Sequence, residues 1–224
     1  MIAIMSTLSV IIPLGPGESF PARLIQSLSE PSDPIQILLA IPEGQARPTD
    51  CDVPIITCPP GRGRQQNTAA SAARGHWLWF VHADCHLPPG AIETVLDFIR
   101  RSSSCLGYCR LRFASDGPAL TRLNAAGANL RSRWLKLPYG DQAFCLPAKT
   151  FNRLGGFRED LQRGEDLDLV VRARDAGLAI RPMGLTITTS ARRYREHGWL
   201  KTTVQHQIAA RQLIRQARAK NSIA

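Results

Sequence analysis

The sequence predicts an α/β fold with a mostly parallel central sheet. Short apolar runs rich in β-branched or aromatic residues recur along the first third of the chain, and proline, glycine or polar residues close each one. Segments with helical spacing separate most of these runs, and such alternation is typical of α/β proteins. The most apolar run, Trp77–Val81, is followed at once by His82 and Asp84. Because ligands of open parallel sheets bind outside the carboxyl ends of the strands, these two side chains mark a candidate site.

The individual elements follow from the period of the apolar residues and from the breakers between them. The expected strands cover residues 7–14, 35–41, 53–58, 77–81, 106–113 and 143–146. The expected helices begin near Ser19, Thr68, Ala91, Ala119, Pro147 and Glu165. The helix over residues 119–137 carries Leu120, Leu123, Gly127, Leu130 and Trp134 on one stripe, with Arg122, Arg131 and Arg133 outside it.

Length and composition indicate an ordinary globular protein. The chain has 224 residues, of which 44% are hydrophobic and 21% charged, and this suits one domain over residues 1–198 followed by a basic amphipathic helix and tail over residues 199–224. No apolar run is long enough to span a membrane, and we expect no signal peptide. The six cysteines are scattered without metal-binding spacing, so we expect reduced thiols in a cytoplasmic protein.

The net charge of +10 narrows the class of partner. A basic protein binds nucleic acid, a phosphate-rich ligand or an anionic membrane surface. The chain has no zinc-finger, helix-turn-helix or RNP-like pattern, and its aromatic residues are too few for a base-stacking platform. We therefore expect no nucleic acid partner. Arg62, Arg64 and Arg74 cluster in sequence near the candidate site, which favours a phosphate-bearing ligand.

The stretch Gly61–Asn67 is expected to form a glycine and arginine loop ahead of an alanine-rich helix that stops at Gly75. Such a loop at a helix N-terminus suits an anion, because free backbone N–H groups point out of the helix there. A solvated turn is an equal alternative, since short glycine motifs are weak signals.

A second acidic stretch opens the helix that begins at Glu165. Capping and the helix dipole explain one acid in this position, but Glu165, Asp166 and Asp168 are three. A carboxylate fixed at a helix start and facing a cleft is well placed to accept a proton from a hydroxyl group. Asp166 is therefore a candidate general base.

The order and spacing of these motifs resemble the family 2 glycosyltransferases, and more narrowly a bacterial subgroup associated with radical-SAM and selenium-domain genes. The resemblance runs from Ser9–Pro13 to Thr189–Arg193. The matching elements are Asn67, Arg74–Gly75, Trp77–Val81, His82–Asp84 at the D-x-D motif, Leu154–Phe157 and Glu165–Leu169.

The resemblance implies the GT-A nucleotide-sugar fold and transfer of a sugar from a nucleoside diphosphate, with UDP favoured, to an acceptor hydroxyl. It implies an inverting reaction in which Asp166, with Glu165 beside it, is the base, and a Mn²⁺ or Mg²⁺ cofactor at Asp84 and His82. The donor site that it implies comprises Pro13, Glu43, Arg62, Arg64, Asn67, His82, Ala83 and Asp84. The implied acceptor site comprises Tyr139, Asp141 and Gln142, although Asp141 has an alternative role in holding its turn.

Three features of the sequence depart from the family pattern. His82 replaces the first acid of the D-x-D motif, and because imidazole is a poorer ligand than carboxylate for Mg²⁺, this replacement weakens metal binding or favours Mn²⁺. Glu43, in a turn after the second strand, is the only counterpart of the acid that reads the base. The Q-x-x-R-W motif of processive synthases is missing, so single sugar additions are expected.

Two other classes of protein stay open. A nucleotidyltransferase or pyrophosphorylase shares the α/β sheet, but it carries a basic loop directly after the first strand, where Gly15–Gly17 has no basic residue. In a non-catalytic nucleotide-sugar binding protein, His82, Asp84 and Asp166 would only cap and hydrogen-bond.

The C-terminal segment from Trp199 to Lys220 is expected to form a basic amphipathic helix with Leu200, Val204 and Ile208 on its apolar stripe. Packing of this stripe on the domain is the favoured interpretation. The alternative is peripheral contact with an anionic membrane, which suits a lipid-linked acceptor.

Overall fold

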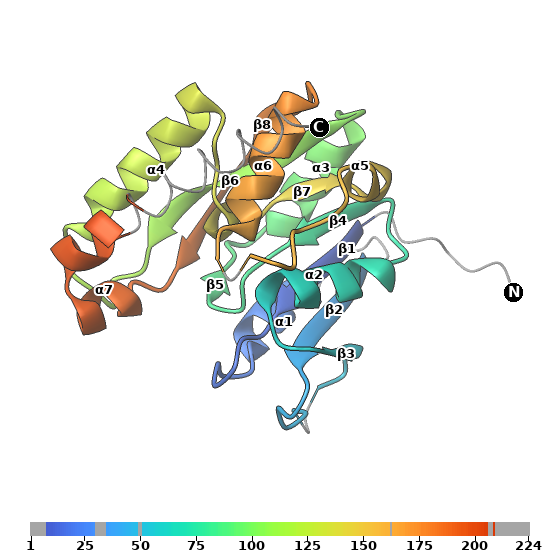
Figure 1. Ribbon diagram of the computed structural model, residues 1–224, viewed down its shortest axis with the longest axis horizontal. Coiled ribbons are helices and arrows are strands. Elements are labelled where there is room, and N and C mark those ends of the chain that lie inside the picture. The colour runs from blue at the N-terminus through green and yellow to red at the C-terminus, as the bar shows by residue number, and fades with distance from the viewer. Residues whose placement is uncertain (1–7, 30–34, 49–50, 162, 206–207, 209–224) are drawn as a thin grey trace, which may run out of the picture.

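A central eight-stranded sheet flanked by helices forms the protein (Figure 1). The computed structural model describes residues 8–29, 35–48, 51–161, 163–205 and 208. The strands are β1 Leu8–Pro13, β2 Ile35–Pro42, β3 Ile55–Cys58, β4 Trp77–Phe80, β5 Cys85–His86, β6 Cys105–Phe113, β7 Cys145–Pro147 and β8 Ala179–Thr189. The helices are α1 Ala22–Leu28, α2 Arg62–Ser71, α3 Ala91–Arg100, α4 Thr121–Leu135, the 3₁₀ helix η1 Gly140–Gln142, α5 Ala148–Arg153, α6 Glu165–Asp175 and α7 Arg192–His197.

The first four strands are parallel and confirm the predicted α/β class. They are ordered β3-β2-β1-β4, and Ile11 of β1 pairs with Leu38 of β2 and with Phe80 of β4. Every residue of β1 and β4 is buried, because helices cover both faces of the sheet. Val10 faces the core shared with α1 and α3, whereas Ile11 faces the core shared with α2, α5 and α6. The carboxyl ends of β1 and β4 therefore open at the same edge.

The second half of the sheet begins with a strand that runs the other way. β7 is antiparallel to β4 on one side and to β6 on the other, with Leu78 opposite Leu146 and Gly107 opposite Cys145. β8 is parallel to β6, and β5 completes the edge antiparallel to β8. Strands β8 and β5 were not predicted from the sequence. Pro182 and Gly184 interrupt the apolar alternation of β8, and β5 has only two residues.

Helix α2 begins six residues earlier than the sequence suggested. The predicted loop over residues 61–67 is the start of this helix, which begins at Arg62 after Gly61 with φ 132° and ends at Ser71. The buried amide of Gln65 holds it in place, because Nε2 donates to the carbonyl oxygens of Leu14 at 2.8 Å and Ala40 at 2.9 Å. Gly75 is not the helix stop. A Cβ there would lie 2.4 Å from the main-chain nitrogen of Ser9, so this glycine permits the close approach of the chain to β1.

Helix α4 turns its bulky apolar side chains away from the protein, contrary to the packing that an amphipathic helix normally shows. Its buried residues are the small ones, Thr121, Ala125, Ala128 and Ser132. The exposed ones are Leu120, Leu123, Leu130, Trp134 and Leu135, at 48 to 71% exposure. Small residues let the helix lie close to β6, where the side chain of Asn129 bonds both the N–H and the carbonyl oxygen of Leu111. Arg131, expected outside, instead lies over the ring of Tyr139 at 3.4 Å.

The described part of the C-terminal segment packs on α4 through polar groups. Residues 199–205 are helical, Trp199 Nε1 donates to Asn124 Oδ1 at 2.5 Å, and Asn124 Nδ2 donates to Thr203 Oγ1 at 3.0 Å. Leu200, Val204 and Ile208 are 67%, 47% and 51% exposed, so in this part the stripe does not pack on the domain as favoured. The rest of the predicted helix lies outside the described residues. No described helix is both long and apolar enough to cross a membrane.

All six cysteines are free thiols, as the sequence predicted, and five of them are buried.

Candidate active site

One wall of the candidate site lies at the carboxyl ends of β1 and β4. Arg62 is the first residue of α2, and its Nη1 lies 3.3 Å from Nδ1 and 3.4 Å from Nε2 of His82. Its Nη2 lies 3.7 Å from Oε1 of Glu18, whose other carboxylate oxygen accepts the N–H of Gly15 at 2.8 Å. The early start of α2 thus places an arginine, rather than a free loop, against the residue that follows β4.

The surroundings change the acidity of both polar residues that follow β4. Burial, and then the positive charges of Arg62 and Arg193, lower the pKa of His82 well below its usual value, so its imidazole is neutral at neutral pH. Asp84 is an exposed residue, but enough protein surrounds its carboxyl group that desolvation, and then the charge of Glu18, raise its pKa. A cation that approached Asp84 would stabilise its charged form and lower its pKa.

The second part of the candidate site comes from η1 and the first turn of α6. Oδ2 of Asp166 accepts the main-chain N–H of Gly140 at 2.5 Å. Burial, and then the charge of Asp166, raise the pKa of Glu165 to about 7. The pKa of Asp141 rises to about 6 through burial and the nearby charges of Asp166 and Asp84, against the opposing effect of Arg131. Since Asp84 and Asp166 both act on Asp141, the structure brings the two predicted acidic stretches close together.

Two other residues of the predicted donor site make structural contacts. The amide of Asn67 is used at both ends, since Nδ2 donates to the carbonyl oxygen of Phe157 at 2.8 Å and to Glu159, and Oδ1 accepts the N–H of Phe157 at 2.9 Å. Arg64 lies 3.6 Å from Glu159 and does not join Arg62 at His82. These contacts tie α2 to the chain after the Leu154–Phe157 motif.

The remaining donor residues are distributed along the same edge of the sheet. Pro13 is the buried last residue of β1, and Ala83 lies half-buried between His82 and Asp84. Glu43 follows β2 with its side chain exposed, and its N–H donates to the carbonyl oxygen of Cys58 at 2.8 Å.

Of the predicted acceptor residues, Tyr139 and Asp141 line a cavity and Gln142 does not. Gln142 is fully buried, where its side chain accepts from Ser132 at 2.6 Å and donates to the carbonyl oxygen of Cys109 at 3.0 Å. Its hydrogen bonds therefore support the turn, and we leave Gln142 out of the acceptor site. Among the three acids of α6, Asp168 also has a structural contact, 2.7 Å from Arg172.

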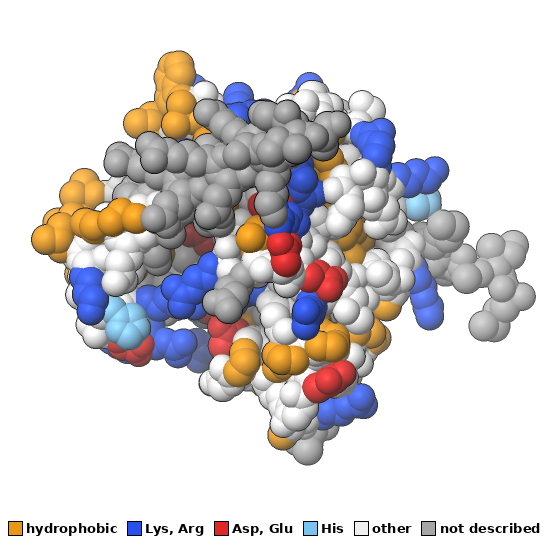
Figure 2. All heavy atoms as spheres, viewed as in Figure 1, with side chains coloured by type: hydrophobic (Ala, Val, Ile, Leu, Met, Phe, Trp, Pro, Cys, Tyr) orange, Lys and Arg blue, Asp and Glu red, His pale blue; other side chains and the backbone are white. Residues whose placement is uncertain are grey.

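Sequence reasoning missed two charged residues of this site. Glu18 lies in the turn after β1, and a lone acid after the first strand of a parallel sheet was a usable signal. The positive charge of Arg193 in α7 lowers the pKa of both His82 and Asp84, although Arg193 follows them by more than a hundred residues in the chain. No local pattern could have placed it there. Figure 2 shows Lys and Arg side chains beside the hollow between α7 and β5.

The residues present fit a divalent cation in one limited way. No group of three or more His, Cys, Asp or Glu side chains that could hold a metal occurs within the described ranges. Asp84 offers a hard carboxylate, and Mg²⁺ commonly binds through one or two carboxylates with the substrate phosphates supplying the rest. His82 does not fit as a ligand in this arrangement, because the guanidinium group of Arg62 lies against both of its ring nitrogens.

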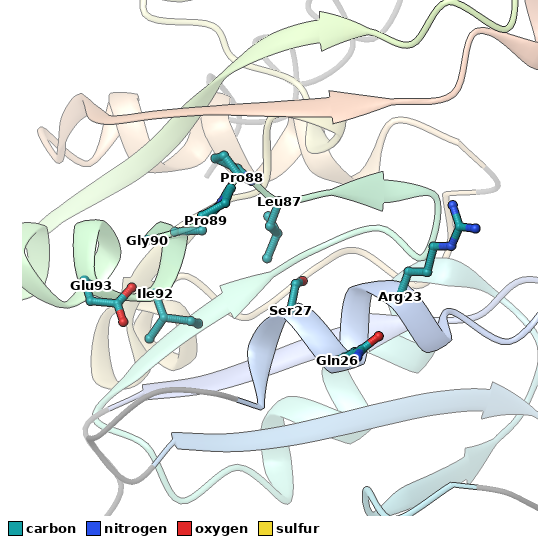
Figure 3. Close-up of a pocket in the computed structure, with 10 residues that line it drawn as sticks. Arg23, Gln26, Ser27, Leu87, Pro88, Pro89, Gly90, Ile92 and Glu93 are labelled. Atoms are coloured by element: carbon teal, nitrogen blue, oxygen red, sulfur yellow. The ribbon is translucent and has the colours of Figure 1, made fainter.

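Next to Asp141 lies a cavity of about 490 Å³ between α4, β6, η1 and α7. Its lining includes Asp141, Arg131, Tyr139, Tyr194, Trp199 and Leu123. A second cavity, of about 310 Å³, lies between α1 and the turn that leads into α3 (Figure 3). Its lining contains none of the candidate site residues, so of these two cavities it is the first that reaches the candidate site, through Tyr139 and Asp141.

The family model for Glycosyl transferase family 2 matches residues 38–158, which is more than half of the chain. The chain therefore belongs to glycosyl transferase family 2. The matched segment contains Arg62, His82, Asp84 and Asp141, and ends before α6. No curated protein matches the sequence significantly.

Solved structures of glycosyltransferases share the fold. Residues 1–349 of S. aureus TarS in complex with UDP-GlcNAc match with a TM-score of 0.63 and 14% identity over 82% of this chain and 58% of that one. The mannosyltransferase PcManGT from Pyrobaculum calidifontis, in complex with GDP-Man and Mn²⁺, matches with a TM-score of 0.66 and 16% identity over 93% of this chain and 64% of that one. The chain thus spans about 60% of the length of these structures, and the likeness confirms the predicted GT-A fold.

Proposed function

We propose that the protein transfers a sugar from a nucleoside diphosphate, with UDP favoured, to an acceptor hydroxyl group. The observation that carries this proposal is that cationic and acidic side chains from distant parts of the chain gather at one edge of the sheet. Arg62, His82 and Asp84 lie at the carboxyl ends of parallel strands. Asp84 and Asp166 both lie near enough to Asp141 to raise its pKa, and Asp166 accepts the N–H of Gly140, the neighbour of Asp141. The UDP-GlcNAc and GDP-Man of the similar structures support a nucleotide-sugar donor.

In the proposed reaction Asp166 is the general base. The acceptor oxygen forms a bond to the anomeric carbon as the bond from that carbon to the diphosphate oxygen breaks, and the electron pair leaves with the diphosphate. The acceptor proton passes to Asp166. The N–H of Gly140 already donates a hydrogen bond to Oδ2 of Asp166, so we assign the uptake of the acceptor proton to Oδ1. Attack from the face opposite the leaving group gives inversion. Glu165 lies beside the base, and its raised pKa makes it a second group able to accept a proton there.

The leaving diphosphate needs positive charge. Arg62 supplies it from the N-terminus of α2, where the free N–H groups also favour an anion. Arg193 supplies it from α7. A Mn²⁺ or Mg²⁺ ion held by Asp84 and the phosphates would neutralise further charge on the leaving group. Arg64 would join only after releasing Glu159.

We keep Pro13, Glu43, Asn67 and Ala83 in the proposed donor site, with Glu43 at the carboxyl end of β2 reading the base. Asn67 contributes by holding α2 against Phe157. Tyr139 and Asp141 form the acceptor side.

We also propose that the protein belongs to the bacterial subgroup associated with radical-SAM and selenium-domain genes, adds single sugars in the cytoplasm, and contacts anionic membrane peripherally. The outward Leu200, Val204 and Ile208 support the membrane contact.

The test begins with a panel of nucleoside diphosphate sugars in a thermal-shift assay with and without Mn²⁺, because a ligand of the native state alone raises Tm. The best donor is then incubated with acceptors, and free nucleoside diphosphate is measured. Sugar transfer with nucleoside diphosphate release supports the proposal. Exchange of pyrophosphate into the donor would indicate a nucleotidyltransferase, and binding without turnover across the acceptor panel would indicate a binding protein.

A further inference from the structure

We infer that the cavity beside Asp141 is an acceptor groove for the hydroxyl-bearing end of a membrane lipid. This inference rests on the proposed function and names the class of its acceptor. The groove is the cavity of about 490 Å³ between α4, β6, η1 and α7, a volume within the usual range for a small-molecule site.

The inner end of the groove is polar and incompletely hydrogen-bonded. Within the described part of the chain, Oδ1 of Asp141 and Nη2 of Arg131 are buried without a hydrogen-bond partner. One atom needs a donor and the other needs an acceptor, and both residues line the groove. A hydroxyl group is donor and acceptor at once, so a single hydroxyl serves both with small side-chain adjustments. The neighbouring charge of Asp166 places this end next to the proposed base.

Much of the remaining lining of the groove is apolar. Leu111, Phe113, Leu123 and Leu135 belong to it, and the two residues from α4 are 61% and 59% exposed. From there the apolar surface continues along α4, where hydrophobic side chains project at both ends of the helix (Figure 2). A long apolar chain that entered the groove with its hydroxyl group at Asp141 would leave along this surface.

A glycine in the middle of α4 forms part of the lining. Gly127 has an ordinary helical φ, and a Cβ built on it meets nothing within 4 Å, so neither strain nor packing requires a glycine there. Glycine inside a helix costs about 1 kcal/mol relative to alanine. The missing side chain instead widens the groove, because Gly127 is one of its lining residues.

The positive charge around the groove favours a membrane lipid as its occupant, rather than a second copy of the chain. Arg122, Arg133, Lys136 and Lys201 are exposed on the same helices as the outward leucines. Two such surfaces would repel each other in a symmetric dimer, whereas basic and apolar side chains together suit an anionic lipid surface.

The test compares Gly127→Leu, which places a bulky side chain in the groove, with its matched control Gly127→Ala. Both changes raise helix propensity, so circular dichroism and Tm will confirm that both variants fold. We expect saturable binding of 1-decanol by the wild-type protein in isothermal titration. Gly127→Leu should weaken it roughly tenfold or more, Gly127→Ala should leave it nearly unchanged, and UDP and GDP should bind all three proteins alike.

The outcomes separate this inference from the proposed function. A wild-type protein that binds nucleotide but not 1-decanol, or equal 1-decanol binding by the leucine variant, overturns the lipid groove alone. A preference for a soluble phenol over 1-decanol would also overturn the lipid groove. So would a stable dimer that the Leu130→Asp change dissociates. Failure to bind any nucleotide or nucleotide-sugar would overturn the proposed function itself.

Discussion

The main-chain N–H of Gly140 donates a 2.5 Å hydrogen bond to Oδ2 of Asp166, and this bond joins η1 to the first turn of α6. A Cβ on Gly140 would lie 2.9 Å from the same oxygen and 3.0 Å from Cβ of Asp166. The carboxylate is therefore positioned both by a hydrogen bond and by the absence of a side chain. Both come from a residue 26 positions earlier in the sequence.

Replacement of Asp166 by asparagine should abolish transfer and retain donor binding. An amide keeps the shape of the side chain but cannot take up the acceptor proton, so we expect kcat to fall by about 10²-fold to 10⁴-fold. Nucleotide affinity, measured by isothermal titration, should stay within about twofold. Asp175→Asn, at the other end of α6, is the matched control. If Asp166→Asn retained activity and Glu165→Gln lost it, the base would be Glu165.

Gly140→Ala should act on the same step through position rather than chemistry. The added Cβ must displace the Asp166 carboxylate, so kcat should fall roughly tenfold or more without a change in nucleotide affinity. Normal turnover by a folded Gly140→Ala protein would show that this contact does not position the base.

Asp84→Ala should remove the dependence of donor binding on Mn²⁺ and leave the fold intact, because the side chain is exposed and not part of the core. The complementary change, His82→Asp, restores a second hard ligand, so the Mn²⁺ concentration for half-maximal donor binding should fall. Titration of Mn²⁺ with a fixed nucleotide measures both effects. Unchanged Mn²⁺ dependence in Asp84→Ala would move the metal site elsewhere.

The buried carboxyl group of Glu165 should make the protein less stable as pH rises. Its pKa is about 7 in the folded state against an ordinary value of 4.5, so the folded protein holds a proton that the unfolded chain releases between these values. The stabilisation is complete below about pH 4.5 and is lost as pH passes about 7, and Asp141, with a pKa of about 6, adds in the same direction. Glu165→Gln removes one of these groups, so its Tm should fall less than that of the wild type between about pH 5 and about pH 8. Parallel curves would contradict the assigned burial.

Peripheral membrane contact predicts salt-sensitive binding to vesicles that contain phosphatidylglycerol. Removal of residues after Arg211 should weaken this binding while activity on a soluble acceptor is largely kept. Trp134→Glu, at a 71% exposed position of α4, should weaken it independently. Equal sedimentation of the truncated and full-length proteins with these vesicles would assign no membrane role to the tail.

The sequence predicted those parts of the site whose local structure is determined by one short stretch of residues. The run Trp77–Val81 could only be a buried strand, so the positions of His82 and Asp84 followed from the sheet. In the same way, the acidic residues Glu165 and Asp166 predicted the start of a helix. The facing of these two stretches depends on the antiparallel strand β7, and no local pattern encodes it.

The errors arose where tertiary contacts outweigh local preference. Residues 61–67 were expected to form a loop ahead of the helix, but the side chain of Gln65 bonds to carbonyl oxygens at the ends of β1 and β2, and the helix starts early. On α4 the stripe of leucines was visible in the sequence. The sequence did not show whether this stripe faces the protein or the solvent, because periodicity gives the faces of a helix without saying which face meets the protein.

The junction between β6 and β7 has a consequence for how the protein opens. Among the described residues, β7 is registered with β4 at three positions and with β6 only at Gly107 and Cys145, whereas β6 is registered with β8 at eight. The junction between β6 and β7 therefore has the fewest registered pairs of any two neighbouring strands described. We expect β6 and β8 to unfold together, before β1, β2 and β4. Amide hydrogen exchange at rising denaturant should resolve two cooperative units, with the proposed base, Asp166, at their boundary.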